Sequence, residues 1–278
     1  MKPFGLRSSG FLVGLFLLLS PLASQAEQTP AADEVIRRAV EQAKRADEQD
    51  IEARYAFRQQ IVTEKLDGKG NVKTRELRLY EVIPIEGLQY RRLLEKDEKP
   101  LAGEDVKKEQ EREKKFRAEI AEIKQRRKQN PDRVLFNEEL VSRYRWELAG
   151  EEVVNNRPAF VLTFAPRSKD LPAKRRMDRV LNKLAGKLWV DKAEYEPVKA
   201  EARLLERVTM WGGLIASISE FTLTFEQTKV DEGAWLPSRM SQYIKGRFFF
   251  NSIHQRSQQQ ASDFQKAAPE LAGTSPRP

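Results

Sequence analysis

The chain has 278 residues and a formal net charge of +8, with 50 Lys and Arg residues against 42 Asp and Glu residues. It has no cysteine and one histidine, His254, which excludes disulfides, thiol catalysis, iron–sulfur clusters and metal sites built from several histidines. The basic residues are interspersed with acids, so we interpret them as a solvated mixed-charge surface with weak attraction to anionic lipid headgroups. We expect no nucleic acid partner.

The N-terminus has the layout of a secretory signal peptide. Lys2 and Arg7 precede a short apolar run at residues 11–19, Pro21 interrupts it, and Ser24 and Ala26 supply the small residues before a cut. The apolar run is short for a membrane span. We therefore expect residues 1–26 to be removed near Ala26 and the mature chain to be exported; an uncleaved anchor is the alternative.

The next segment predicts one helix followed by a three-stranded meander. Residues 32–47 carry apolar side chains at helical spacing and acids in the first turn. Tyr55, Phe57 and Ile61 share one strand parity, and residues 67–71 are rich in turn formers. Two further strands are expected at about residues 75–85 and 87–96.

Residues 103–130 change character and predict a charge-dense helical insertion. Phe116, Ile120 and Ile123 form its one apolar stripe, and Asn130-Pro131 ends it. We favour an exposed helix that packs on the body through this stripe. A movable cover over an apolar surface is the alternative.

The second half predicts mostly strands. Tyr144, Trp146 and Leu148 alternate with charged residues, Asn155-Asn156 predicts a turn, and Phe160, Leu162 and Phe164 return. A short helix is expected at residues 174–186, with Gly186 as its C-cap. Strands then follow at about residues 188–190, 198–204, 218–230 and 235–243, with a turn or bulge at Gly212-Gly213. A last strand at residues 246–256 is apolar on both faces, and residues 267–278 are expected to be disordered.

These elements predict an α+β fold with about nine to eleven antiparallel strands. A sheet of this length must curl, so we expect an incomplete, half-open β-barrel whose concave face is plugged by helices. The whole is expected to form a single domain over residues 27–266.

No catalytic or metal-binding constellation is recognisable. Asp191, Glu194 and Glu196 form the densest acidic cluster near an aromatic residue, but their spacing is typical of a hairpin turn rather than of a glycosidase pair. His254 is interpreted as a sheet-surface or packing residue. We expect no enzyme activity, no cofactor and no metal.

Apolar side chains on long strands are the remaining candidates for function. Individually they suit an ordinary core, but together they could line a cavity for an acyl chain; burying about 16 carbons would contribute roughly 12 kcal/mol before ordering costs. The candidate lining residues are Tyr55, Phe57, Trp146, Phe160, Phe164, Leu204, Phe221, Leu223 and Phe225.

Three segments carry a resemblance to a known family. The Gly-x-Leu-Trp-Val-Asp strand at residues 186–191, Glu196-Pro197-Val198 and Trp235-Leu236-Pro237 resemble the periplasmic outer-membrane lipoprotein carrier superfamily, the LolA-like or lipoprotein-sorting proteins. The resemblance extends over about residues 34–264. It implies an incomplete barrel in the periplasm with an apolar cavity and no covalent chemistry. The charged insertion and the greater length depart from the classical carriers, and their gating arginine could match Arg58, Arg75 or Arg145, so none is assigned.

The resemblance implies a first hypothesis, a non-catalytic monomeric carrier. It would hold lipoprotein acyl chains or another lipid and exchange them with membrane-bound donor and acceptor proteins. The alternative is an envelope protein-binding or sensor module on the same scaffold. A third hypothesis, an exported hydrolase, would depend on Asp191 and Glu196.

Overall fold

One antiparallel sheet with 12 strands makes up most of the structure. The computed structural model describes residues 30–130, 134–210, 216–249 and 251–267. The predicted signal peptide, Gly212-Gly213 and the tail after Ala267 lie outside the described residues.

The strand bounds follow the chain. They are β1 (Tyr55–Leu66), β2 (Val72–Ile85), β3 (Leu88–Lys96), β4 (Lys99–Pro100), β5 (Tyr144–Val154), β6 (Arg157–Pro166), β7 (Leu184–Asp191), β8 (Pro197–Leu204), β9 (Val208–Met210), β10 (Ala216–Asp231), β11 (Ala234–Phe248) and β12 (Asn251–Lys266). The helices are α1 (Ala32–Glu48), the 3-10 turn η1 (Ile51–Arg54), α2 (Glu104–Ala118), α3 (Ile120–Gln129), α4 (Glu138–Val141) and α5 (Asp178–Leu181).

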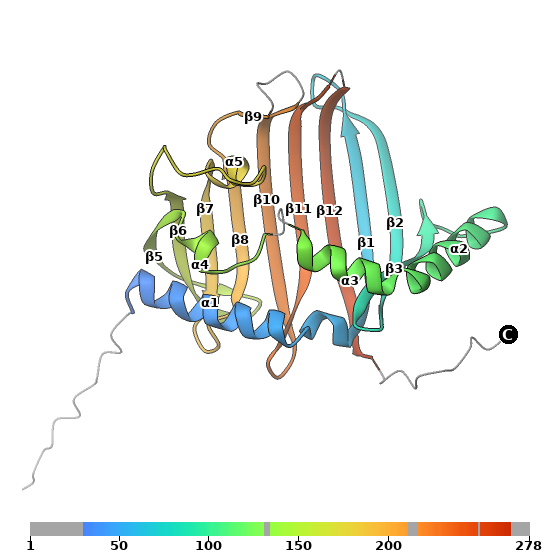
Figure 1. The fold of residues 1–278 in the computed structure, drawn as a ribbon, viewed down its shortest axis with the longest axis horizontal. Helices are drawn as coiled ribbons and strands as arrows, with labels where there is room; N and C mark the ends of the chain where they lie inside the picture. Colours follow the sequence, from blue (N-terminus) through green and yellow to red (C-terminus); the bar gives the residue numbers. More distant parts are fainter. Residues whose placement is uncertain (1–29, 131–133, 211–215, 250, 268–278) are drawn as a thin grey trace, which may run out of the picture. The chain divides into compact units, whose positions relative to one another are not determined.

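The sheet is open, which confirms the predicted incomplete barrel with helices. Its strand order is β4-β3-β2-β1-β12-β11-β10-β8-β7-β6-β5, and β9 pairs with β10. Because β12 pairs with β1, the chain's last strand joins the N-terminal meander to the C-terminal strands. Figure 1 shows α1 and α3 crossing the same face of this sheet.

Helix α1 is held by its apolar stripe. Val35, Ile36, Ala39 and Val40 are buried, and they form one cluster with side chains of β6 and β7 such as Leu162 and Leu188. Asp33 and Glu34 lie in the first turn and Arg45 in the last, where each charge complements the helix dipole. The helix ends one residue beyond the prediction.

The charged insertion forms two helices rather than one. Glu119 separates α2 from α3. Ile120 is buried and packs with Phe116 and Ile123 against Ile85, Leu88 and Tyr90 at the end of the N-terminal meander. The predicted apolar stripe is therefore the attachment of these helices to the sheet.

Two predictions were wrong, the helix at residues 174–186 with Gly186 as its C-cap and the single strand at residues 246–256. Gly186 is not a helix C-cap: the helix covers only residues 178–181, and Gly186 lies in β7, opposite Ala202 of β8. Strand pairing on both sides of β7 prevailed over the helical spacing of Met177, Val180 and Leu184.

The expected single strand at residues 246–256 is a hairpin. Strand β11 ends at Phe248 and β12 begins at Asn251, with Phe248 paired with Asn251. The turn was missed because Phe249, which follows β11 in the turn, is a strand former rather than a turn former.

Candidate functional site

A cavity lies between the inner face of the sheet and the helices that cross it. Its volume is about 680 Å³, within the range of sites that hold small organic ligands. The sheet contributes Leu188, Ala200 and Phe225, and α2 and α3 contribute Phe116 and Ile123. Further lining residues come from the end of α1, from η1 and from the segment before α4, namely Ala43, Ala46, Ile51, Ala53, Leu135 and Phe136.

The strand register explains why the sheet has room here. Leu162, Leu188, Ala200, Phe225 and Met240 are successive partners across β6, β7, β8, β10 and β11. Strand partners of this kind lie on one face of a sheet. Alanine stands in the middle of this otherwise bulky apolar row, so the floor of the cavity is hollow where β8 passes.

The neighbouring row is similarly small at its centre. Phe164, Gly186, Ala202 and Leu223 pair in sequence across β6, β7, β8 and β10. Gly186 is required by close packing, because a Cβ there would lie 1.8 Å from the carbonyl oxygen of Glu201. The absence of side-chain bulk in β8 therefore extends over two rows, and in the second row it includes β7.

The structure brings one of the nine predicted lining residues, Phe225, to this cavity. Leu223 lies two residues earlier on the same face of β10. Trp146 borders a smaller pocket of about 420 Å³ beside α1, and Phe160 is buried beneath α1. Contact of these residues with lipid stays a prediction.

The remaining predicted residues lie in other parts of the core. Phe164, Leu204 and Phe221 pack around Leu181 of α5. Tyr55 packs with Leu236, while Phe57 stacks on Phe264 with a ring separation of 5.4 Å. Arg58, Arg75 and Arg145, the three unassigned arginines, are 60%, 54% and 67% exposed and do not line the cavity.

Glu196 is the polar group of the cavity wall that stands out. It is 5% exposed, and its Oε1 accepts a hydrogen bond of 3.1 Å from Nε2 of Gln227, which also lines the cavity. Burial raises the pKa of Glu196 to about 7, against the lowering effect of this hydrogen bond and with help from the negative charges of Glu194 and Asp191. The cavity therefore carries one carboxyl that is neutral in mild acid and charged in mild base.

Asp191 belongs to the turn and not to the cavity. Its carboxylate accepts bonds of 2.7 and 3.0 Å from Arg157 and of 2.8 Å from the backbone N–H of Glu194. Burial alone would raise the pKa of Asp191, but these bonds outweigh it and lower the pKa. The turn interpretation is confirmed for Asp191, whose carboxylate accepts hydrogen bonds from Arg157 and from the turn backbone, whereas Glu196 lines the cavity.

Sequence reasoning missed Glu196 as a cavity residue because its hydrogen-bond partner Gln227 and the floor residue Phe225 lie on β10, about 30 residues away in the sequence, and reach it only through the pairing of β8 with β10. A glutamate directly before a proline at the start of a strand, beside an acidic turn, was the available signal. His254 also has a structural contact: its Nδ1 lies 2.6 Å from the carbonyl oxygen of Asp67 and links two hairpins.

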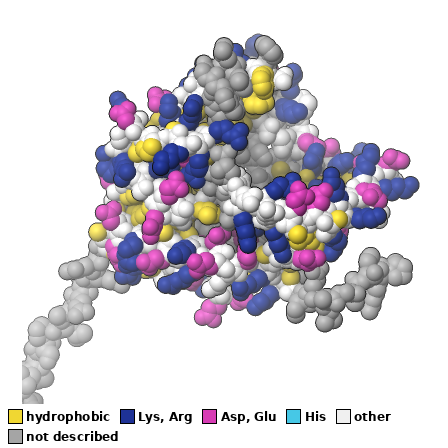
Figure 2. All heavy atoms as spheres, viewed as in Figure 1, with side chains coloured by type: hydrophobic (Ala, Val, Ile, Leu, Met, Phe, Trp, Pro, Cys, Tyr) yellow, Lys and Arg dark blue, Asp and Glu magenta, His cyan; other side chains and the backbone are white. Residues whose placement is uncertain are grey.

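Helices α2 and α3 cover one side of the cavity and carry charges of both signs on their outer surface (Figure 2). Arg92 of β3 pairs with Glu113 at 3.0 Å, and Lys96 pairs with Asp105 at 2.9 Å. These ion pairs are partly exposed, so each contributes about 0–1 kcal/mol. The apolar stripe of Phe116, Ile120 and Ile123 therefore provides most of the attachment.

Two further observations concern the residues described. Among them, no three His, Asp or Glu side chains lie close enough together to hold a metal ion. No helix in the described ranges has the length and apolar character needed to cross a membrane.

Comparison with known proteins gives structural similarities only. No family model matches the chain. No curated protein matches it either.

Three solved structures are similar over most of their length. One is a LolA superfamily protein from Nitrosomonas europaea, with 13% identity, coverage of 89% of this chain and 99% of that one, and a TM-score of 0.31. Another is a putative outer membrane lipoprotein-sorting protein domain from Vibrio parahaemolyticus, with 14% identity, coverage of 86% and 95%, and a TM-score of 0.29. A third is the MucA/MucB complex of Pseudomonas aeruginosa, with 11% identity, coverage of 86% and 99%, and a TM-score of 0.25. Identities and TM-scores this low say nothing about what this chain binds.

Proposed function

We propose that this protein is a non-catalytic carrier in the periplasm that holds the acyl chains of a lipoprotein or of another lipid. The observation that carries the proposal is the hollow over Ala200 and Phe225, roofed by apolar side chains of α2 and α3. Such a site binds by excluding water from apolar surface and needs no reactive group. The predicted signal peptide supports export, with residues 27–266 as one mature domain.

Cargo would enter by displacement of α2 and α3. Their ion pairs to β3 are weak, and the larger contribution comes from Phe116, Ile120 and Ile123. An acyl chain in the cavity would contact Phe116 and Ile123, so it could replace part of the apolar contact that opening removes. Membrane-bound donor and acceptor proteins would then drive loading and release.

The first experiment is native mass spectrometry of the exported protein with lipid analysis of bound material. An acylated species at about one per chain would support a carrier. The matched variants are Ala200→Phe, which fills the hollow, and Ala121→Phe, which adds the same bulk at an exposed position of α3.

Loss of the bound lipid in A200F and its retention in A121F is the expected result. Phe225→Glu, which places a charge on the same floor, provides a second test. If both floor variants fold and bind fatty acid probes as the unmodified chain does, the cavity is not the site.

The second candidate function is an envelope protein-binding module. Strand β5 lies at the end of the sheet order, so one side of its 11 residues has no partner strand among the described residues. An open edge can accept a strand from another protein. Hydrogen exchange would then show protection of β5 in the presence of an envelope extract, and A200F would bind the partner normally.

A further inference from the structure

One end of the sheet gathers several hairpin tips. Strands β1 and β2 join there, and so do β11 and β12, at the end of the strands opposite to α1 (Figure 1). His254 of β12 contacts the Asp67 carbonyl of the β1–β2 turn, and Lys65 pairs with Gln255. Arg207, just before β9, donates a 2.9 Å bond to Oγ of Ser217 on β10. These contacts hold the tips as one surface.

Exposed apolar side chains concentrate at this end. Phe248 and Phe249 are 46% and 49% exposed, with ring centroids 4.8 Å apart in an edge-to-face arrangement. Val72, Leu205 and Ile253, on the neighbouring tips and strand ends, are also exposed. Of the seven large apolar side chains that are exposed among the described residues, these five lie at this end, on separate projecting tips, and Val134 and Val153 lie elsewhere.

The backbone at the tip favours a functional explanation. Phe249 has φ of 52°, in the left-handed region that bulky side chains avoid and that glycine or asparagine would occupy readily. Local conformation alone would select a small residue at this position. A large aromatic ring at a position with this conformational cost is the kind of outlier that motivates a functional hypothesis for the ring.

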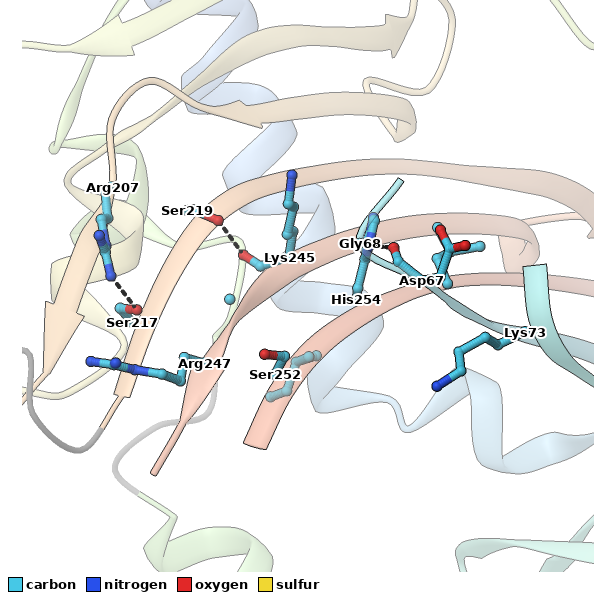
Figure 3. Close-up of a pocket in the computed structure, with 13 residues that line it drawn as sticks. Asp67, Gly68, Lys73, Arg207, Ser217, Ser219, Lys245, Arg247, Ser252 and His254 are labelled. Carbon is cyan, nitrogen blue, oxygen red and sulfur yellow. Dashed lines mark hydrogen bonds between the residues drawn. The ribbon is translucent and has the colours of Figure 1, made fainter. Parts of the chain in front are cut away.

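Basic and hydroxyl side chains lie directly beside the aromatic tip. They line an open pocket of about 560 Å³ (Figure 3). The lining cations are Lys73, Arg207, Lys245 and Arg247, and the lining hydroxyls belong to Ser217, Ser219 and Ser252. The hydroxyl of Ser219 already donates to the carbonyl oxygen of Lys245 at 3.0 Å, so the cations are the main groups that suit phosphate oxygens.

Acidic groups neutralise this pocket only in part. Asp67 is the lining carboxylate, and its oxygen accepts the backbone N–H groups of Lys69 and Asn71 at 2.8 and 2.9 Å. Lys245 pairs with Glu220 at 3.0 Å. Among the described residues, no carboxylate lies within ion-pair distance of Lys73 or Arg207, so positive charge remains.

We propose that this end of the sheet docks on an anionic phospholipid membrane, with Phe248 and Phe249 in the interfacial layer and the neighbouring cations on lipid phosphates. Interfacial binding combines buried apolar area with attraction to anionic headgroups, and both are present here within one surface. Separate projecting tips fit a soft lipid interface better than a protein partner, which would require a continuous complementary face. This inference is independent of the cavity, because the two sites share no residue.

The test is sedimentation with vesicles of phosphatidylcholine alone and with vesicles of equal parts phosphatidylcholine and phosphatidylglycerol. Wild type and variants are compared in the same processed form, so any contribution of the predicted signal peptide to vesicle binding is the same for all of them. We expect the chain to sediment with the anionic vesicles, and added salt to weaken this binding. The double variants Phe248→Ser/Phe249→Ser and Lys73→Gln/Arg247→Gln should each weaken it by roughly tenfold or more.

Matched controls come from the opposite end and from α1. Val153 is 71% exposed near the β5–β6 turn, and the Lys44 side chain on α1 is 73% exposed. Val153→Ser and Lys44→Gln should leave binding within about twofold. A200F should also bind vesicles normally, which separates failure of this proposal from failure of the carrier function.

Because the chain has no cysteine, a single introduced cysteine can be labelled selectively to report whether that position enters the membrane. An environment-sensitive fluorophore on Asn251→Cys, at the tip, should shift to the blue on anionic vesicles, whereas one on Val153→Cys should not. Equal sedimentation of wild-type and tip variants, or no shift at either position, would overturn the proposal. A dimer in solution that the Phe248→Ser/Phe249→Ser variant dissociates would instead assign this end to a second copy of the chain.

Discussion

Gln227 and Glu196 form a hydrogen-bonded pair of side chains on the cavity wall, with Nε2 of Gln227 donating at 3.1 Å to Oε1 of Glu196. The same Nε2 donates at 2.8 Å to the carbonyl oxygen of Pro197. An amide nitrogen carries two hydrogens, so both acceptors are served. The pair fixes a buried carboxyl, with a pKa of about 7, beside apolar floor residues.

The first prediction is that Glu196 makes stability fall as pH rises. In the unfolded chain this carboxyl ionises near its ordinary pKa of 4.5, whereas in the folded chain burial raises the pKa to about 7. Between these values the folded state holds a proton that the unfolded state has released, so unfolding is favoured as pH increases. The total effect is about 3 kcal/mol at roughly 1.4 kcal/mol per pKa unit.

Glu196→Gln removes the titrating proton and keeps an acceptor for Gln227. Urea unfolding should find E196Q more stable than wild type by about 3 kcal/mol at about pH 8, with little difference at about pH 5. Glu147→Gln, at a side chain that is 68% exposed, is the control and should follow wild type. Parallel stability curves for wild type and E196Q would show that Glu196 is not perturbed.

The second prediction concerns ligand binding and rests on the proposed carrier function. An acyl chain in the cavity removes water from Glu196, so it should bind better when the carboxyl is neutral. Titration with a fluorescent fatty acid should give tighter binding at about pH 6 than at about pH 8 for wild type, and a flat profile for E196Q. The ionisation of the probe's own carboxyl is controlled with a fatty alcohol probe. A wild-type profile that E196Q reproduces would remove Glu196 from the site.

Local sequence patterns predicted an element well where one apolar face or one turn motif is sufficient to identify it. Helix α1 is recognisable from Val35, Ile36, Ala39 and Val40 alone, and Asn155 and Asn156 take the left-handed conformation expected of their turn. The cavity could not be predicted in this way. It depends on Ala200 lying beside Phe225 and Leu188, and strand parity does not reveal which face the helices will cover.

The errors have the same physical origin. The helical spacing before Gly186 was overridden by pairing with β6 and β8, which are distant in sequence. At the β11–β12 tip, Phe248 ends the strand and Phe249 occupies a turn position for which its residue type gives no signal. The first case shows long-range pairing prevailing over local preference, and the second shows a turn that local residue preference does not reveal.

The third prediction tests the close packing of β7 on β8. Gly186→Ala would place a Cβ 1.8 Å from the carbonyl oxygen of Glu201, a backbone atom that cannot move without breaking the strand pairing. We expect a loss of about 3 kcal/mol or more in the free energy of unfolding. Gly68→Ala is the matched control, because nothing lies within 4 Å of its added Cβ, and thermal unfolding should change little. Similar melting temperatures for G186A and wild type would contradict the close approach.

The fourth prediction separates a structural acid from a catalytic one. Asp191 is 1% exposed and receives two bonds from Arg157, so Asp191→Asn removes the closer of the two acidic partners of this guanidinium and leaves only Glu194, at 3.2 Å. We expect a loss of about 3 kcal/mol in the free energy of unfolding near neutral pH, moderated because Arg157 is partly exposed. The pKa of Asp191 is lowered from 3.8, so this stability is present above that value and is lost as pH falls through the folded-state pKa. The difference between D191N and wild type should therefore shrink in acid, while Asp170→Asn, at an exposed site, should match wild type throughout. A stability unchanged by D191N, together with loss of a hydrolytic activity, would instead restore the hydrolase hypothesis.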